Sequence, residues 1–505
     1  MSETPDPTVF PLDHLAVRGA PEAPALLFKD RSLSFEALNR RIGQLAAWLA
    51  GAVPEKGARV ATWLPKSELA CLMPLAAVRA GLVHVPVNPL LKRAQVAYVM
   101  ADSGARLLIA NRARLDTLEP GDAPAPVPEG DVWSAAEALD PLGLSSGAAD
   151  DLAAILYTSG STGRPKGVML SNANLWLGAV SVAHYLKLSA QDRVLGVLPL
   201  AFDYGQNQLL STWYAGAAVA PLDYLTPRDV VKAVERFGIT TIAAVPPLWV
   251  QLVEQAWPEA VAGQLRRLTN SGGALTPGLV KSLRKLFPQA DIFAMYGLTE
   301  AFRSTFLEPR LIDTEPTSIG TEIPFAEVKV VADDGNEALP DQEGELVHAG
   351  PLVAQGYWQD AERTAERFRP APSFSRYGGI AVWSGDRVRR DARGLLHFVG
   401  RRDAMIKTSG NRVSPQEVED AAVATGLVAE AVALGLPDAA LGQAIHLVVR
   451  GDQANAEELR ARLVRELPNF MVPKVVHWRE SLPVSPNGKL DRVALAAQLR
   501  EGLEA

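Results

Sequence analysis

The sequence predicts an α/β protein in which parallel-rich sheets covered by helices form a large N-terminal domain, followed by a small α+β domain. Three observations support this fold class. The 505 residues exceed what a single hydrophobic core usually holds. From about residue 150, short apolar runs alternate with segments of helical period, and parallel neighbouring strands need such crossover connections. After about residue 400 the elements become shorter, so we expect domains of residues 1–402 and 403–505.

The middle of the large domain carries the clearest alternation. Two of its expected helices begin with a threonine at the N-cap position and a proline at the first helical position, Thr226–Pro227 and Thr276–Pro277. In parallel sheets of this kind, ligands bind at the carboxyl ends of the strands. The expected strands are "DRVLGVLPLA", "AAVAPL", "ITTIAAV" and "DIFAMYG", and the expected helices are "DYGQNQLLSTWYAG", "TPRDVVKAVERFG" and "TPGLVKSLRKLF".

The small domain is expected to begin at the polar junction "GRRDAMIKTSGNR", which we interpret as a hinge. Ser414, Pro415 and Glu417 have the spacing of a capping box that opens a helix at "PQEVEDAAVA". The strands "AEAVALGL" and "AIHLVVR" then precede the helical segment "NAEELRARLVREL". Within the large domain, residues 117–150 are rich in Pro, Gly, Ala and acidic residues and are expected to form a variable surface loop.

Charge and cysteine content narrow the function. The net charge of −7 provides no basic face for nucleic acid, whereas a nucleotide needs only a local pocket. Cys71 is the only cysteine, so an internal disulfide and a paired-cysteine zinc site are excluded, which fits a reducing cytoplasm. The segment "MSETPDPTVF" has no basic region followed by an apolar one, and there is no run of about 18 apolar residues. We therefore expect a cytoplasmic protein without a membrane span.

The stretch "YTSGSTGRPKG", residues 157–167, suggests a phosphate-binding loop. Glycines let successive backbone amides point inward, and amides, hydroxyls and the ammonium of Lys166 suit a polyphosphate. The P-loop pattern would need glycine where Pro165 stands, and the dinucleotide fingerprint would need glycine where Thr162 stands. A flexible Gly/Ser linker is the alternative. The strand-like segments "LAAILY" before the stretch and "GVML" after it argue against a linker.

With four further motifs in order, the chain resembles the AMP-forming adenylating enzymes, which include acyl-CoA synthetases, peptide-synthetase adenylation domains and firefly-type luciferases. The further motifs are "YGLTE", "SGD", "GRRDAMIKTSGNRVSPQEVE" and "PVSPNGKLDR". Within this superfamily the stretches "FDYGQNQL", "TEAFRST" and "ATGLVAEAVALGLPDAALGQAI" look most like the acyl-CoA ligases associated with exosortase A gene sets.

The resemblance implies an ATP-dependent acid–thiol ligase. A carboxylate is a poor electrophile, so the enzyme would first transfer AMP from ATP to the acid and release pyrophosphate, with Mg²⁺ as cofactor. The acyl group would then pass to a pantetheine thiol, as in an acyl-CoA synthetase. The alternative is a stand-alone amino-acid adenylation enzyme that loads an acyl or peptidyl carrier protein. Both acceptors present the same thiol arm, so the core motifs do not separate coenzyme A from a carrier protein.

The resemblance also implies roles for single residues on the nucleotide side. Catalysis would involve Lys489, which would bridge the carboxylate and the α-phosphate, together with Thr162 and Glu300, which would hold Mg²⁺. The phosphates would contact Thr158, Ser159, Gly160, Ser161, Thr162, Gly163 and Lys166. The adenine would lie beside Tyr296, Gly272, Gly273 and Ala274, with Gly297 and Thr299 of the same motifs also in the ATP site. The ribose would contact Asp386 and Arg401.

Thioester formation in this superfamily follows a rotation of the small domain. By resemblance Asp403 would be the hinge residue, and Lys407 and Gly410 would line the path of the pantetheine thiol. Arg412 would contact phosphate. An ordinary turn is the alternative explanation for Gly410.

The candidate acyl pocket departs from many acyl-CoA synthetases, in which an aromatic residue and a histidine follow "LPL". Here Phe202, Asp203 and Tyr204 occupy that region, and Met295 and Arg303 are expected nearby. A carboxylate beside an apolar pocket is unfavourable unless it is paired, and a substrate ammonium would pair Asp203. Asp203 and Arg303 either bind an amino and an acidic group of one substrate or pair with each other. We favour a small, amino-bearing or otherwise polar carboxylic acid as the substrate.

Two other classes of protein share this pattern. A nucleotide-binding protein without enzymatic activity could have the same fold, but Lys166, Glu300, Asp386, Arg401 and Lys489 are all retained. A luciferase-type oxygenase would share the adenylation step and would consume oxygen.

Overall fold

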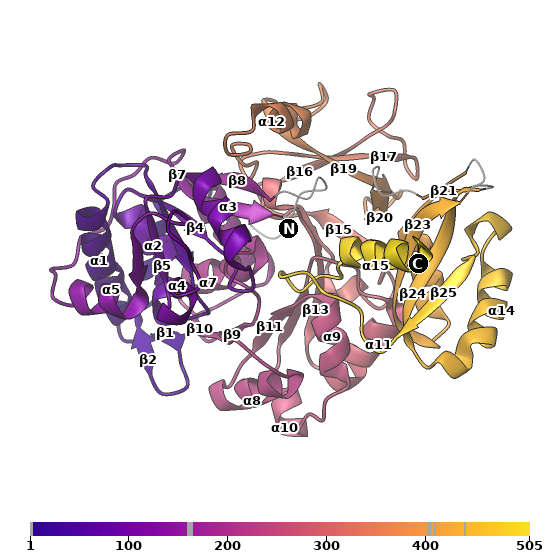
Figure 1. Cartoon of the computed structure of the whole chain (residues 1–505), viewed down its shortest axis with the longest axis horizontal. Coiled ribbons are helices and arrows are strands. Elements are labelled where there is room, and N and C mark those ends of the chain that lie inside the picture. The colour runs from indigo at the N-terminus through magenta and orange to yellow at the C-terminus, as the bar shows by residue number, and fades with distance from the viewer. Residues whose placement is uncertain (1–3, 159–164, 402–405, 409–410, 439–440, 505) are drawn as a thin grey trace.

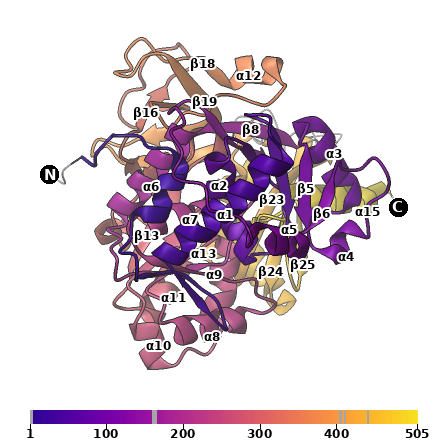
Figure 2. The same ribbon diagram turned by 90° about the vertical axis from the view of Figure 1, so that its left-hand side faces the viewer.

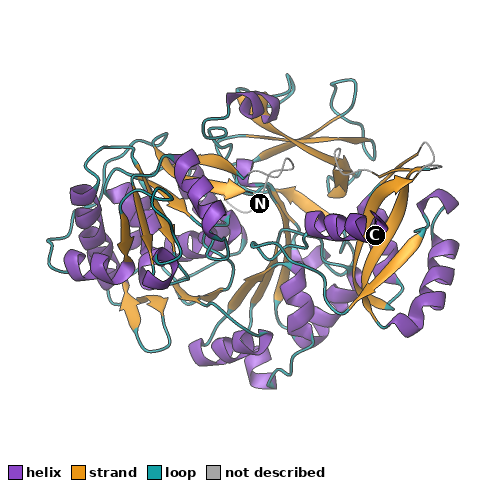
Figure 3. Ribbon diagram, viewed as in Figure 1, coloured by secondary structure: helices purple, strands orange, loops and turns teal. Residues whose placement is uncertain are grey.

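The computed structural model describes residues 4–158, 165–401, 406–408, 411–438 and 441–504. In this part of the chain, sheets of six, 14 and five strands lie across the molecule from the N-terminal to the C-terminal region (Figure 1). Helices flank the sheets (Figure 3). This arrangement confirms the expected α/β class, with a large sheet-rich N-terminal region and a small C-terminal one.

The six-stranded sheet is parallel except at one edge. Its strand order is β6-β5-β3-β4-β7-β8, and β7 pairs with β8 antiparallel. Figure 2 shows α1 and α2 side by side in front of this region. The strands are β3 (Arg59–Trp63), β4 (Val83–Pro86), β5 (Leu107–Ala110), β6 (Pro126–Pro128), β7 (Leu152–Thr158) and β8 (Lys166–Ser171). The helices are α1 (Phe35–Ala52), α2 (Glu68–Arg79), α3 (Arg93–Ser103), α4 (Arg112–Leu115), α5 (Glu129–Ala136) and α6 (Asn172–Tyr185).

The prediction of a surface loop over residues 117–150 was wrong for part of that segment. β6 extends the sheet beside β5, and α5 follows it directly with Val132 and Ala136 buried. These two residues are four apart and so share one helix face. A helix of about two turns is too short to give a recognisable period among Pro, Gly and acidic residues. The segment between α5 and β7 is the loop that was expected.

The 14-stranded sheet changes from parallel to antiparallel along its length. β1, β10, β9, β11, β12 and β13 are successive parallel neighbours, and the pairs from β13 to β16 are antiparallel. The strands are β1 (Pro24–Leu27), β2 (Ser32–Ser34), β9 (Arg193–Gly196), β10 (Ala218–Pro221), β11 (Thr241–Ala244), β12 (Arg267–Asn270), β13 (Asp291–Tyr296), β14 (Thr305–Phe306), β15 (Ser318–Glu322), β16 (Glu327–Val331), β17 (Glu343–Ala349), β18 (Phe368–Pro370), β19 (Ile380–Arg390) and β20 (Leu396–Arg401). The helices are α7 (Asp203–Tyr214), α8 (Pro227–Phe237), α9 (Pro246–Val253), α10 (Glu259–Gly263), α11 (Pro277–Leu286) and α12 (Ala361–Arg367).

The elements expected in the middle of the large domain are confirmed. β9, β10, β11 and β13 and helices α7, α8 and α11 fall within the segments named from the sequence. Thr276 caps α11 by accepting a hydrogen bond from the Leu279 amide (3.2 Å). Phe202, Gly272 and Tyr296 lie at or after the carboxyl ends of β9, β12 and β13, at the sheet edge where the parallel arrangement predicts a ligand.

The small C-terminal region forms a five-stranded sheet with helices α13 to α15, as expected. β21 lies between β22 and β24, and β24 also pairs with β23 and β25. The strands are β21 (Ile406–Thr408), β22 (Asn411–Val413), β23 (Val428–Asp438), β24 (Gly442–Gly451) and β25 (Val475–Arg479), and the helices are α13 (Pro415–Ala424), α14 (Ala456–Glu466) and α15 (Arg492–Glu504).

The predicted capping box at the start of α13 is wrong, although the helix begins at Pro415 as expected. The Ser414 side chain accepts no capping hydrogen bond from the helix. Its hydroxyl instead donates to the carbonyl of Val399 on β20. A serine hydroxyl donates as well as accepts, and here the tertiary contact takes precedence over the local one. The side chain therefore connects the large domain to the first helix of the small one.

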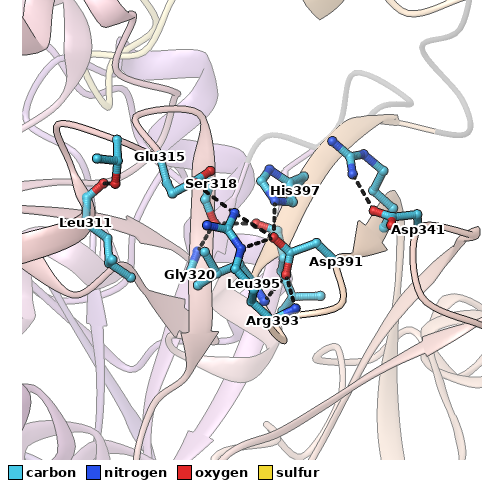
Figure 4. Close-up of polar contacts among 12 residues, drawn as sticks. Leu311, Glu315, Ser318, Gly320, Asp341, Asp391, Arg393, Leu395 and His397 are labelled. Carbon is cyan, nitrogen blue, oxygen red and sulfur yellow. Dashed lines mark hydrogen bonds and ion pairs between the residues drawn. The ribbon is translucent and has the colours of Figure 1, made fainter.

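A polar turn fixes the hairpin that joins β19 to β20 (Figure 4). Burial alone would raise the pKa of Asp391, but hydrogen bonds from the Leu395 amide and the Arg393 side chain lower that pKa to about 2. The Arg393 amide also donates to this carboxylate (2.9 Å). The hairpin register places Asp386 directly opposite Arg401. The turn and a one-residue register shift between Arg387 and Val388 together bring these two residues, both assigned to the ribose from the sequence, face to face.

Candidate active site

Lys166, Glu300 and Tyr357 form a closed hydrogen-bonded cluster. Lys166 begins β8, and Glu300 lies on the short 3₁₀ helix η2 (Thr299–Ala301). The Lys166 ammonium donates to the Glu300 carboxylate (2.9 Å) and to the Tyr357 hydroxyl (2.6 Å), and that hydroxyl donates to the same carboxylate oxygen (2.6 Å). Burial would raise the pKa of Glu300, but the charge of Lys166 and the Tyr357 hydrogen bond lower it. Glu300 is therefore an ionised carboxylate at neutral pH.

Tyr296, Asp386 and Arg401 form a second polar group, with Tyr296 and Arg401 at the ends of β13 and β20 and Asp386 within β19. The Tyr296 hydroxyl donates to the Asp386 carboxylate. The Arg401 guanidinium lies 3.9 Å from the same carboxylate. Burial and the neighbouring Asp386 charge raise the pKa of Tyr296, so its hydroxyl stays protonated and donates.

The loop between β25 and α15 extends from the small domain toward the large sheet (Figure 1). The side-chain amide of Asn88 donates to the Pro486 carbonyl (3.0 Å) and to the side-chain oxygen of Asn487 (3.1 Å). These two hydrogen bonds anchor the loop. Gly488 has φ of +78°, and its amide donates to Ser485 (2.8 Å). The predicted glycine turn is therefore present, and it presents the next residue, Lys489, to the large domain.

Lys489 lies between the two halves of the site. A Cβ added to Gly272 would be 2.6 Å from Cε of Lys489, so a larger residue here would require the lysine side chain to shift. The ammonium lies 4.7 Å from the centroid of the Phe202 ring. Burial lowers the pKa of Lys489, partly opposed by the negative charge of Asp203. A buried lysine with a lowered pKa, beside charged partners and between two binding regions, is typical of functional sites.

Asp203 is the first residue of α7 and only 6% exposed. Burial raises the pKa of its carboxyl, although the charges of Arg303 and Lys489 lower it in part. Its Oδ1 atom makes no hydrogen bond within the described chain. Among the described residues, Asp203 and Arg303 form no ion pair within 4.0 Å. The alternative in which these two side chains form a direct structural bridge is therefore not what the geometry shows.

The walls around Arg303 combine aromatic rings with hydroxyl groups. Arg303 donates to the Ser271 hydroxyl (2.8 Å), and its guanidinium lies 4.6 Å from the centroid of the Tyr204 ring. The Tyr204 hydroxyl bonds with Thr269 (2.6 Å). The sulfur of Met295 accepts a hydrogen bond from the hydroxyl of buried Tyr185 (2.9 Å). Phe202, Tyr204, Met295 and Arg303 thus gather in one region, as expected.

Several sequence-predicted residues are not described in full. Ser159, Gly160, Ser161, Thr162, Gly163, Asp403 and Gly410 lie outside the described residues. Lys407 and Arg412 are described by their backbones, which face each other across β21 and β22. Conversely, the sequence reasoning missed Asn88 and Tyr357. Both act through contacts with residues far away along the chain, and neither stands in a local pattern that would have indicated a role.

Comparisons with known proteins agree with this arrangement. The sequence profile of the AMP-binding enzyme family matches residues 14–358, and that of the AMP-binding enzyme C-terminal domain matches residues 417–489. The chain is 32% identical to a feruloyl-CoA synthase of an Amycolatopsis species, covering 94% of this chain and 95% of that protein. It is also 32% identical to tyrocidine synthase 2 of Brevibacillus parabrevis, where the match covers 94% of this chain but 13% of that protein.

The fold agrees with solved structures over almost the whole chain. ATP-bound MatB from Rhodopseudomonas palustris superposes with a TM-score of 0.88 and 25% identity, covering 98% of this chain and 99% of that one. The chain therefore belongs to the AMP-binding enzyme family. It is an AMP-forming ligase of carboxylic acids, of the class that includes acyl-CoA synthetases and peptide-synthetase adenylation domains.

These relatives do not bear on the finer resemblance to exosortase-associated ligases, which stays a prediction. In the described part of the chain, no helix has the length and apolar character needed to cross a bilayer.

Proposed function

We propose that this ligase adenylates a small, amino-bearing carboxylic acid and then transfers the acyl group to the thiol of coenzyme A. The observation that carries the proposal is the position of Lys489. Its ammonium, delivered by the small domain, lies beside Phe202 and over Gly272, where the acyl and nucleotide sides meet. Adenylation needs a cation at that junction, because negative charge develops on phosphate oxygens as the carboxylate attacks.

The nucleotide side supports ATP binding. Lys166 and Thr158 flank the glycine-rich stretch, whose other members Ser159 to Gly163 would supply amides and hydroxyls to the phosphates. Asp386 and Arg401 would contact the ribose. Tyr296, with Gly272, Gly273 and Ala274, would border the adenine, and Gly297 and Thr299 would complete that wall.

Glu300 fits a magnesium ion. Its carboxylate is ionised and largely shielded from solvent, with 12% of the side chain exposed, and hard cations such as Mg²⁺ prefer oxygen ligands. The described residues contain no group of three or more His, Cys, Asp or Glu side chains able to hold a metal. A protein that supplies one or two oxygens and leaves the rest to phosphate and water matches the way Mg²⁺ binds in nucleotide sites. Glu300, with Thr162, would hold the ion, which would neutralise phosphate charge.

Asp203 would bind the amino group of the acid. A buried carboxylate with one free oxygen is unfavourable, and a substrate ammonium would supply both charge and hydrogen bonds. The residue begins α7, so the backbone donors of that helix end favour its ionised form when the substrate is present.

The second half-reaction would follow a rotation of the small domain, taken here as residues 403–505, about Asp403. Lys407, Gly410 and Arg412 would then approach the thiol and phosphates of the acceptor. A phosphopantetheine arm on a carrier protein is the second candidate acceptor, because the peptide synthetase relative is as similar in sequence as the acyl-CoA synthetase. We expect the reaction in the cytoplasm, which supplies ATP and coenzyme A.

An ATP–pyrophosphate exchange assay tests the proposal. A panel of amino acids, amino-substituted acids, simple fatty acids and aryl acids should give exchange with amino-bearing acids, and Asp203→Ala should remove that exchange. Exchange with fatty or aryl acids alone would contradict the assignment of Asp203. Oxygen consumption in the same mixture would favour a luciferase-type oxygenase. Incubating the adenylate with coenzyme A and with a phosphopantetheinylated carrier protein then identifies the acceptor.

A further inference from the structure

One face of α7 is polar and faces a cavity inside the large domain. Tyr204, Asn207, Gln208, Ser211 and Thr212 follow the spacing of a single helical face, and all five line this cavity. All of them are buried. A buried helix face is normally apolar, because burying polar groups without partners is unfavourable. The hydroxyls of Tyr204, Ser211 and Thr212 have hydrogen-bond partners, so Asn207 and Gln208 are the members of this wall that packing alone does not explain.

Several polar atoms in this wall have no partner. Nδ2 of Asn207, Oε1 of Gln208, Oγ1 of Thr241 and Nε of Arg303 are buried and make no hydrogen bond within the described residues. All four residues line the same cavity. Buried polar groups in folded proteins are almost always hydrogen-bonded, so four such atoms around one cavity need polar partners, which water or the polar groups of a ligand can supply. The groups on Asn207 and Arg303 can only donate, the Thr241 hydroxyl can donate or accept, and Oε1 of Gln208 can only accept.

Arg303 is brought to the cavity by a strained turn. Phe302 has φ of +61° and ψ of −70°, and the Arg303 amide donates to the Ala301 carbonyl (2.7 Å), which defines a γ-turn of the rare type. A Cβ on Gly178 would lie 2.5 Å from the Phe302 ring, and one on Gly297 would lie 2.9 Å from Cα of Arg303. Strain of this kind is maintained mainly at functional sites. The turn and both glycines serve the placement of one guanidinium.

The guanidinium is a buried charge whose near partners are a hydroxyl and a ring, Ser271 and Tyr204. Arg303 is 2% exposed, and in the described chain no carboxylate lies within 4.0 Å of it. A buried charge without an opposite charge in contact is unfavourable, and a carboxylate is the group whose geometry matches the arginine fork. The cavity is about 20 Å³, room for about one water-sized group beyond the side chains that close it. Long acyl chains do not fit such a space.

We propose that Arg303 and Asn207 bind a second anionic group, at the end of a short substrate opposite the reacting carboxylate. This inference rests on the proposed function and specifies its substrate class. Lys489 would face the reacting carboxylate, Asp203 the amino group and Arg303 the distal anion. Short amino dicarboxylic acids carry these three groups in one molecule.

The test compares matched acids in the exchange assay. Aspartate and glutamate carry the distal charge, asparagine and glutamine replace it with an amide of the same shape, and 2-aminobutanoate and norvaline lack it. We expect the wild-type protein to prefer a dicarboxylic member. Arg303→Gln should lower its kcat/KM by about 30-fold or more, the effect of removing one partner of a buried charge pair, and should change the amide substrates only a few-fold. Arg310→Gln, at an exposed position, is the matched control.

Two results would overturn the inference. An equal loss for all acids in Arg303→Gln would place Arg303 at the reacting carboxylate. A wild-type preference for the amide or apolar members, or for long-chain acids, would show that no distal anion is recognised. Arg303→Lys keeps the charge and should retain part of the dicarboxylate preference. Thermal unfolding of each variant, compared with wild type, identifies a variant that has merely misfolded.

Calorimetry can measure how tightly the acids bind in the presence of AMP, and this measurement separates the inference from the ligase proposal. If no acid supports exchange but a dicarboxylic acid binds and Arg303→Gln weakens that binding, the proposed reaction fails and the pocket assignment holds. If no dicarboxylic acid binds to the wild-type protein, the pocket assignment fails.

Discussion

The nucleotide side and the acyl side of the active site differ in how their buried polar groups are paired. On the nucleotide side, Lys166, Glu300 and Tyr357 satisfy one another through three hydrogen bonds, although Oγ1 of Thr158 has none within the described chain. On the acyl side, Asp203 and Arg303 are also buried, yet each has an atom without a hydrogen bond in the described chain.

The difference follows from what each side binds. Polar groups that pair with one another cost little free energy in the absence of a ligand. They exchange these partners for the ligand when it binds. A buried group without a partner costs about 1–3 kcal/mol until the ligand supplies one. The nucleotide is common to all members of the family, whereas the acid is particular to each. We therefore expect substitutions on the nucleotide side to alter ATP affinity and substitutions on the acyl side to alter the choice of acid.

The largest effect is expected where the two sides meet, at Lys489. Lys489→Ala removes the cation proposed to stabilise charge in the adenylation transition state. Exchange should fall by about 10²–10³-fold, as for the loss of one transition-state donor. Thioester formation from a supplied acyl-adenylate should remain near the wild-type rate, because the rotated small domain would then present Lys407 and Gly410 instead.

The control for this experiment is Lys281→Ala, which removes an exposed lysine from α11. Both half-reactions should be unchanged in it. Equal loss of adenylation and thioester formation in Lys489→Ala would contradict its assignment to the first step and remove support for domain rotation.

The acyl side should show a distinctive pH dependence through Asp203. Burial raises the pKa of this carboxyl above its usual value, so the carboxylate takes up a proton as pH falls through that raised pKa. Binding of an amino-bearing acid needs the ionised form, so kcat/KM should decline on the acid side. Asp203→Asn should lower kcat/KM for amino acids by about 10–100-fold at neutral pH, as for losing a hydrogen bond to a charged group, and the acid-side decline should disappear.

The measurement is a pH profile of exchange for one amino acid and one simple acid of equal length. The simple acid should show no decline assigned to Asp203. If kcat/KM of Asp203→Asn declines at low pH in the same way as that of wild type, another group titrates. The pairing of Asp203 with a substrate ammonium would then be wrong.

The same comparison explains how far sequence reasoning reached. Local patterns predicted the parallel strands, helices α8 and α11, and the glycine turn at Gly488, because each depends on neighbours in the chain. Motif resemblance indicated Lys166 and Glu300 separately, 134 positions apart. Their direct contact and the closure of the cluster by Tyr357 depend on the folded sheet, and nothing local specifies them.

On the acyl side, sequence reasoning left two options for Asp203 and Arg303, and the geometry shows no direct bridge between them. The γ-turn at Phe302 could not be predicted, because a left-handed phenylalanine has no sequence signature and depends on the space left by Gly178. The capping box at Ser414 failed for a related reason, since a distant carbonyl competed for the hydroxyl.

The smallest effect is expected on the nucleotide side, from Tyr357→Phe. The hydroxyl donates to Glu300 and accepts from Lys166, but its removal leaves the direct contact between those two residues (2.9 Å) intact. Because the remaining pair still holds both charges, we expect KM for ATP to rise by less than about 10-fold, below the full value of a charged hydrogen bond. KM for the acid should not change. Tyr377→Phe, at an exposed tyrosine, is the control. A larger change in KM for the acid than in KM for ATP would show that the two sides are coupled through Tyr357, and the division of the site into a self-paired nucleotide side and a ligand-dependent acyl side would no longer hold.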